Sequence, residues 1–103
     1  MADQRIIKQI VNVVLSVIKP EKIILFGSQS YGNPSTDSDY DILIIIDGIQ
    51  DHYKLLKKLY RKMIEVDAAV DIILKNTEEV EESKQRLVSV VKDALNKGTV
   101  IYE

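Results

Sequence analysis

The chain has 103 residues, a length that suits one small domain, so we expect a single domain over residues 1–103. It contains no cysteine, which excludes disulfides, thiolate catalysis and cysteine-based zinc sites, so any metal would have to be bound through oxygen. The formal net charge of −2 argues against broad, charge-driven nucleic-acid binding, because that mode uses lysines and arginines to displace counterions. No apolar run approaches a membrane span and no signal-peptide pattern is visible, so we expect a cytoplasmic protein without a membrane partner.

The first predicted element is a helix over residues 3–18. Asp3 is a suitable N-terminal cap, and Pro20 ends the segment because proline cannot continue a helix. The apolar residues that recur at helical spacing, and that we expect on the buried face, are Ile7, Ile10, Val11, Val14 and Ile18.

A strand and a turn follow. Residues 22–26 form an apolar run that stops at Gly27-Ser28, a pattern typical of a buried strand that ends at a turn. Residues 27–32 predict a turn that opens a short helix, and residues 33–38 are a loop by local composition.

The middle of the chain predicts a second strand and a crossover helix. Residues 40–46 are nearly all apolar, which favours a central strand covered on both faces. An amphipathic helix over residues 50–65 then has a length that suits a crossover between strands. Five basic residues fall close together on this helix, and we interpret them as its solvated side: Lys54, Lys57, Lys58, Arg61 and Lys62.

The last third predicts a strand, a helix and a short final strand. Residues 69–74 are a third apolar strand interrupted by one charge, and residues 98–102 form the final strand. Asn76 followed by Glu79 predicts a capping box that starts one last helix, which Gly98 ends. We expect its buried face to carry Val80, Leu87, Val91 and Leu95. Strands that alternate with helices indicate an α/β domain.

Three aspartates are the candidate metal ligands. Asp39 and Asp41 project to the same side of a strand, because side chains alternate with period 2, and two neighbouring carboxylates repel unless a cation lies between them. Asp71 lies inside an apolar strand, where an unpaired charge is costly, so we expect it beside the first two in a site for two magnesium ions about 4 Å apart. The alternatives are turn and strand-start roles for Asp39 and Asp41, a solvent-facing edge charge for Asp71, and Asp67 as the third ligand.

The Gly27-Ser28 turn is the candidate phosphate site. Gly27 has no side chain to block a phosphate, and Ser28 offers a hydroxyl and a backbone N–H. The alternative is a tight strand-to-helix turn, which favours the same residues. Gly27 and Gly32 have the outer spacing of a P-loop, but Asn33-Pro34 stands where lysine and serine or threonine are required, which excludes that motif.

These residues resemble the nucleotidyltransferases related to DNA polymerase beta, and among them the small stand-alone group called minimal nucleotidyltransferases. The similarity covers nearly the whole chain and is most specific from the turn at residues 26–28 to Asp41. It implies a mixed β-sheet packed against helices. Members often carry arginines in the turn, where this chain has Gln29 and Tyr31; Gln29 could retain a hydrogen bond to phosphate but has no charge.

The resemblance implies an enzyme that transfers a nucleoside monophosphate, AMP from ATP, to a hydroxyl with magnesium as cofactor. It also implies a partner, because minimal nucleotidyltransferases commonly pair with a small helical HEPN-domain toxin and act as its antitoxin, adding AMP to a tyrosine of that toxin. The alternative is a binding module of the same fold that neutralises the HEPN partner by contact, with weak or lost catalysis. The absence of arginine at positions 29 and 31 favours the binding module, and the three carboxylates favour the enzyme.

Overall fold

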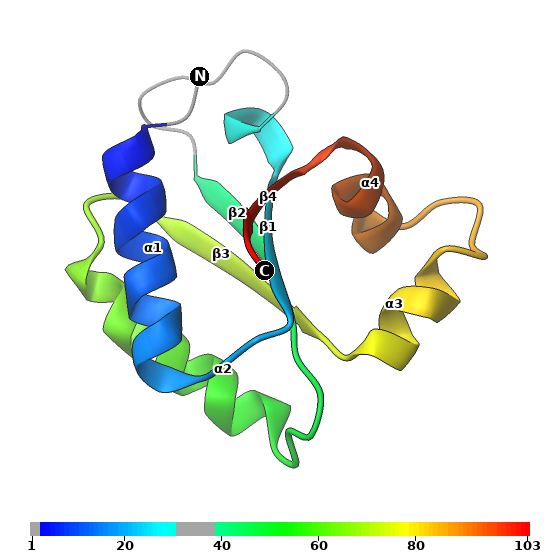
Figure 1. Cartoon of the computed structure of the whole chain (residues 1–103), viewed down its shortest axis with the longest axis horizontal. Helices are drawn as coiled ribbons and strands as arrows, with labels where there is room; N and C mark the ends of the chain where they lie inside the picture. Colours follow the sequence, from blue (N-terminus) through cyan, green and yellow to red (C-terminus); the bar gives the residue numbers. More distant parts are fainter. Residues whose placement is uncertain (1–2, 31–38) are drawn as a thin grey trace.

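The computed structural model describes residues 3–30 and 39–103, and shows helices on both sides of one sheet (Figure 1). The predicted α/β class is confirmed. The elements are, in chain order, α1 (Gln4–Val17), β1 (Lys22–Phe26), the 3₁₀ turn η1 (Gly27–Gln29), β2 (Tyr40–Ile45), α2 (His52–Lys62), the 3₁₀ turn η2 (Met63–Glu65), β3 (Val70–Lys75), α3 (Thr77–Ser83), α4 (Val90–Lys97) and β4 (Thr99–Tyr102). No helix in these two described ranges is long and apolar enough to cross a membrane.

The sheet is mixed, with the strand order β3-β2-β1-β4. Strand β2 runs parallel to β3 and antiparallel to β1, and β1 runs antiparallel to β4. Helix α2 is the crossover that joins the parallel pair, as its length predicted. The prediction of a central second strand is confirmed, because β2 has neighbours on both edges and Ile42, Leu43 and Ile44 are fully buried.

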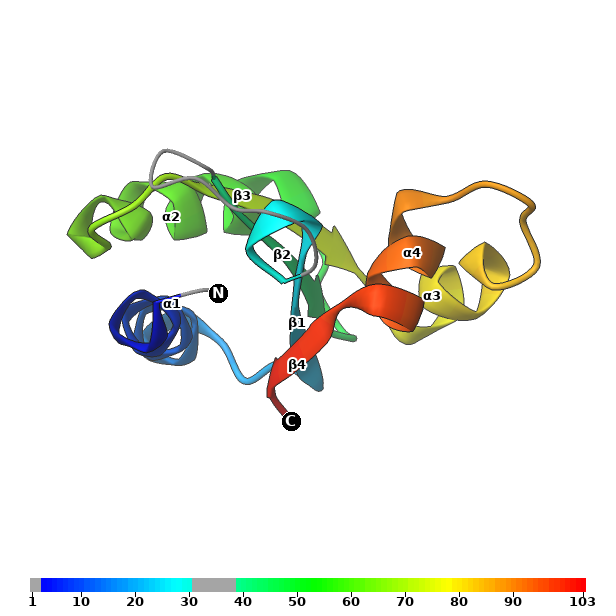
Figure 2. The same ribbon diagram turned by 90° about the horizontal axis from the view of Figure 1, so that it is seen from above.

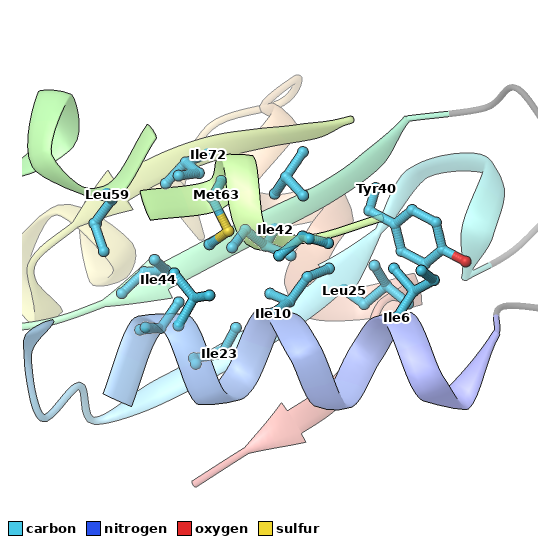
Figure 3. Packing of buried hydrophobic residues seen from close by; sticks show 14 of the residues in the cluster. Ile6, Ile10, Ile23, Leu25, Tyr40, Ile42, Ile44, Leu59, Met63 and Ile72 are labelled. Atoms are coloured by element: carbon cyan, nitrogen blue, oxygen red, sulfur yellow. The ribbon is translucent and has the colours of Figure 1, made fainter. Parts of the chain in front are cut away.

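Two apolar clusters cover the two faces of the sheet. The larger cluster lies under α1 and α2, where Ile10 of α1 and Leu59 of α2 pack against Ile42 and Ile44 (Figure 3). The smaller cluster lies on the other face and includes Leu43, with α3 and α4 as its cover. Seen from above, α1 and α2 stand on one side and α3 and α4 on the other (Figure 2). Alternation along β2 therefore divides its side chains between two cores.

Helix α1 begins as predicted but turns a partly different face to the core. The Asp3 carboxylate accepts a hydrogen bond of 2.8 Å from the Arg5 amide, so the predicted cap is confirmed. Ile6 and Val13, which the spacing did not select, are buried, while Ile7, Val11 and Ile18 are only half-buried. The buried residues are Ile6, Ile10, Val13 and Val14. Apolar side chains surround most of this helix, so periodicity alone cannot choose between adjacent faces.

The prediction of one long final helix is wrong, because α3 and α4 are separate. The capping box at Asn76 and Glu79 is confirmed, yet α3 ends at Ser83. Ser89 then caps α4 by accepting a hydrogen bond from the Lys92 amide, which starts a new helix. Leu87, expected on the buried face, lies between the helices and is 98% exposed.

Gly98 ends α4 as predicted, although by close approach and not through a left-handed conformation. A Cβ atom at this position would contact the Ala94 carbonyl oxygen and would lie 2.6 Å from the Ile24 side chain. The glycine therefore lets the chain pass directly from α4 into β4 against β1.

Candidate active site

The three predicted aspartates lie at one end of the parallel strand pair. Asp41 of β2 and Asp71 of β3 are direct neighbours in the parallel register, and Asp39 stands one residue before β2 begins. Side chains alternate between the two faces of the sheet along each strand. Asp41 therefore lies on the same face as Leu43, two residues further along β2, and Asp71 lies on this face too because it pairs with Asp41. The register thus brings Asp41 and Asp71 side by side, and the three-aspartate metal site stays a prediction.

Two carboxyl groups of the acidic cluster, which comprises Asp39, Asp41 and Asp71, have raised pKa values. Burial raises the pKa of Asp41 above its ordinary value, and the charges of Asp71 and Asp39 raise it further. The pKa of Asp71 is also raised, first by desolvation, then by a side-chain hydrogen bond with Asp39 and by the charge of Asp39. A carboxyl–carboxyl hydrogen bond requires a shared proton. The raised pKa values of Asp41 and Asp71 mean that full ionisation of the cluster is disfavoured, and a bound cation would offset this.

The turn after β1 lies against this acidic cluster. Gly27 has a φ of +76°, a left-handed conformation that side chains rarely adopt. A Cβ atom on Gly27 would contact Oδ2 of Asp41 and would lie 3.2 Å from its Cγ. Phe26 is paired with Asp41 across β1 and β2, which explains why the turn and the carboxylate meet. The space left open by Gly27 is therefore taken by the Asp41 carboxylate, a role that sequence reasoning missed.

The remaining turn residues are placed by contacts with β4. The Ser30 amide donates to the Gly27 carbonyl at 3.0 Å, and the Ser30 and Thr99 hydroxyls form a hydrogen bond of 2.8 Å. Ser28 is half-buried, and Gln29 is only 7% exposed. A phosphate would therefore reach Ser28 and the turn backbone more readily than the Gln29 side chain. The Tyr31 and Gly32 positions discussed from the sequence lie outside the described residues.

The donor atoms of the acidic cluster fit a hard divalent cation. Carboxylate oxygens are the ligands that Mg²⁺ prefers, and the three aspartates offer no softer donor. Within residues 3–30 and 39–103, however, no three acidic or histidine side chains stand close enough together to hold one ion in the present rotamers. The two-ion centre therefore stays a prediction. The carboxylate donors support it, and the aspartate side chains would have to change rotamer to bind an ion together.

Asp67, the competing third ligand, is engaged elsewhere. Its carboxylate accepts a 2.7 Å hydrogen bond from the Arg5 guanidinium and a 3.1 Å bond from the Gln9 side chain, and its amide donates to Gln9. The hydrogen bonds from Gln9 and Arg5 lower the pKa of Asp67. Asp67 therefore ties the segment before β3 to α1.

Tyr60 positions the strand that carries Asp71. Its hydroxyl accepts a hydrogen bond of 2.8 Å from the Ile72 amide, on the outer edge of β3. This satisfies a backbone group that an edge strand would otherwise leave to water. Tyr60 falls within the amphipathic helix predicted over residues 50–65, and the sequence pattern does not indicate a bond to the strand.

A mixed sheet with a left-handed Gly-Ser turn beside paired acidic strand residues defines a domain of the nucleotidyltransferase class. The chain belongs to the family described as polymerase beta, nucleotidyltransferase, whose model matches residues 8–103. The fold and the family resemblance predicted from the sequence are thereby confirmed. No curated protein matches the chain.

Solved structures with this fold include toxin–antitoxin complexes. One is a toxin–antitoxin with AMP-PNP, with 22% identity, a TM-score of 0.61, and coverage of 93% of this chain and 72% of that one. Another is a proposed nucleotidyltransferase from Sulfolobus solfataricus, with 25% identity, a TM-score of 0.60, and coverage of 93% and 78%. A third is the tri-AMPylated HEPN toxin of Shewanella oneidensis with its MNT antitoxin, with 21% identity, a TM-score of 0.54, and coverage of 96% and 71%.

Proposed function

We propose that the chain is a magnesium-dependent nucleotidyltransferase that transfers AMP from ATP to a hydroxyl of a partner protein, and that it is the antitoxin of a HEPN toxin pair. The observation that carries the proposal is the direct pairing of Asp41 with Asp71, with Gly27 against the Asp41 carboxylate. Membership of the nucleotidyltransferase family supports the reaction class.

In the proposed reaction the partner hydroxyl oxygen attacks the α-phosphorus of ATP. A new P–O bond forms, the bond to the β-phosphate oxygen breaks, and pyrophosphate leaves with its electron pair. Asp39, Asp41 and Asp71 would hold the magnesium, which when bound stabilises charge on the phosphates. Asp71 would accept the hydroxyl proton on a carboxylate oxygen, since it is paired with Asp41 at the same end of the strands.

The choice of AMP and of a protein acceptor is supported by two of the similar structures. One of those complexes contains AMP-PNP, and the other contains a HEPN toxin that carries AMP groups. The described part of this chain is one sheet with its covering helices, so we propose that the partner brings the acceptor to the acidic cluster.

A second candidate is a binding module of the same fold that neutralises its partner by contact alone. Two observations favour it: the aspartates of the acidic cluster are not grouped closely enough for a shared ion within the described ranges, and no arginine lies in residues 27–30. The largely buried Gln29 does not supply the missing positive charge.

One mutant separates the two candidates. The chain is mixed with a HEPN-domain partner, magnesium and labelled ATP, and the partner is analysed by mass spectrometry. We expect label on the partner with wild type and none with Asp39→Asn/Asp41→Asn, while Glu21→Gln behaves as wild type because this exposed side chain precedes β1, at the other end of the strand from the Gly27 turn. The enzyme proposal fails if wild type leaves no nucleotide adduct and the double mutant neutralises the partner equally well.

A further inference from the structure

The outer surface of α2 carries a concentrated positive charge. Residues 52–64 include five lysines and arginines and no acidic residue, although the whole chain has a net charge of −2. The ion pairs found in the described ranges involve none of these five side chains. A solvated helix face usually mixes both signs, because opposite charges three and four residues apart stabilise it. Helix α2 lacks that mixture.

An apolar stripe runs beside the charges. Tyr53 is 71% exposed, Ile64 is 83% exposed and Tyr60 is 39% exposed. Lys57 lies between the two tyrosines, and Ile64 follows in the 3₁₀ turn η2 that continues α2. The four residues are separated by four, three and four positions, which places them along one side of α2 and this turn. The stripe is about 16 Å long at 1.5 Å per residue. Lys57 already lies 5.4 Å from the centre of the Tyr53 ring.

A depression accompanies the stripe at its N-terminal end. It has a volume of about 490 Å³ and is lined by Asp51, Tyr53, Lys54, Lys57, Lys58 and Arg61. Charged side chains border an exposed aromatic ring here, an arrangement found where a protein buries an apolar anchor inside a polar rim.

We infer that this surface of α2, defined by Tyr53, Lys57, Tyr60 and Ile64 with Lys54, Lys58 and Arg61 beside them, docks an acidic amphipathic helix of the partner protein. The inference rests on the proposed function, because it concerns how the partner that supplies the hydroxyl is held. A helix of about three turns, with apolar residues at heptad spacing and glutamate or aspartate on its flanks, matches both the length and the charge.

The stripe favours a protein over a single-stranded nucleic acid. Binding to a single strand relies on aromatic rings that can stack on bases. The Tyr60 hydroxyl is bonded to the Ile72 amide, which holds the ring against the edge of β3, and Ile64 cannot stack. The acidic residues outside α2 would also repel a polyanion at long range.

A second copy of the chain fits less well. Helix α3 is acidic, with Glu78, Glu79, Glu81 and Glu82, but it has only seven residues. Its Val80 is buried in the smaller core, so α3 has no apolar residue to place against Tyr53 and Ile64.

The docking surface lies next to the strand of the acidic cluster. Tyr60 is bonded to Ile72, the residue after Asp71, on the outer edge of β3. A helix laid along α2 would therefore run beside this edge, and the chain continuing from it could pass around β3 toward Asp71. This would make α2 a positioning surface for the acceptor, separate from the residues that touch it.

The test uses a synthetic probe peptide of about three heptads with leucine at the a and d positions and glutamate at e and g. Binding is measured by fluorescence anisotropy and mapped by amide chemical shifts. We expect the shifts to fall on α2, and Lys57→Glu/Lys58→Glu to weaken binding by about tenfold or more. Tyr53→Ser/Ile64→Ser should also weaken it. Lys8→Glu/Lys19→Glu is the matched charge control and should bind as wild type.

Four results would each overturn the inference. They are the absence of peptide binding, equal binding of a peptide with the same composition in scrambled order, equal weakening in the lysine control, and tighter binding of a single-stranded RNA through the same lysines. Self-association of wild type that is lost in Tyr53→Ser/Ile64→Ser would assign the surface to a second copy instead. Asp41→Asn should still bind the peptide, because this residue lies outside the docking surface. Peptide binding that is kept while nucleotide transfer is lost would therefore separate the docking inference from the proposed transfer activity.

Discussion

At the residue scale, the raised pKa values of Asp41 and Asp71 mean that ionising these carboxyl groups is costly in the metal-free protein, first because of desolvation and then because of the neighbouring carboxyl groups. A carboxyl group whose folded-state pKa is raised binds its proton more tightly in the native state than in the unfolded chain, so stability falls as the pH rises through the interval between the two values. The native state is least penalised well below about pH 4, where these carboxyl groups are protonated in both the folded and the unfolded chain.

Asp41→Asn should therefore stabilise the metal-free protein at neutral pH and reduce this loss of stability between acid and neutral pH. The gain should be below about 1 kcal/mol, because partial exposure to water screens the repulsion. Thermal unfolding at pH 4 and pH 7 in the presence of a chelator measures it. A variant that is less stable than wild type at pH 7 would show that Asp41 contributes a favourable contact to the fold.

Gly27 is the second residue whose environment makes a quantitative prediction. Gly27→Ala should destabilise by about 1 kcal/mol for the left-handed φ and by more for the contact with Asp41. Gly48→Ala is a matched control, since Gly48 has a φ of +79° and a Cβ there would meet nothing within 4 Å. Chemical denaturation should show a clearly larger loss in the free energy of unfolding for Gly27→Ala. Equal losses for the two variants would mean that the Asp41 side chain moves away from the new Cβ atom at no cost.

At the element scale, the sequence predicts some parts of the fold well. Strand β1 is predicted because a short apolar run stops at Gly27-Ser28, and the crossover helix α2 because its amphipathic period is regular. The final helix is not, because a helical period continues through residues 84–89 although Ser89 starts a new helix there. Local capping at Ser89 competes with the apolar pattern, and spacing does not reveal which of the two prevails.

The broken helix leads to a prediction about stability. Leu87→Ser should change the free energy of unfolding by less than about 0.5 kcal/mol, because the side chain is almost fully exposed. Ser89→Ala should cost about 1 kcal/mol by removing the cap of α4. A continuous helix would give the opposite order, with a large loss for Leu87→Ser, and urea denaturation of the two variants distinguishes these outcomes.

At the scale of the whole molecule, the candidate site depends on register that no single segment contains. The sequence indicated which aspartates are candidate metal ligands, because carboxylates next to a Gly-Ser turn are typical of a site that binds a metal and a phosphate. The sequence predicted Asp71 beside the other two aspartates, but the register that makes it the direct neighbour of Asp41 follows only from how β3 aligns with β2. The contact of Gly27 with Asp41 likewise follows from the pairing of β1 with β2. Tyr60 likewise reaches Ile72 only after α2 has packed beside the edge strand.

The central claim is that this register builds a metal-dependent triphosphate site. Calorimetric titration with magnesium and a non-hydrolysable ATP analogue tests it most directly, with wild type, Asp41→Asn and the control Asp51→Asn measured under the same conditions. We predict binding for wild type and for Asp51→Asn that disappears when magnesium is omitted, and weaker binding by about tenfold or more for Asp41→Asn, because a metal ligand is lost. Equal magnesium-dependent affinity of wild type and Asp41→Asn would contradict the account.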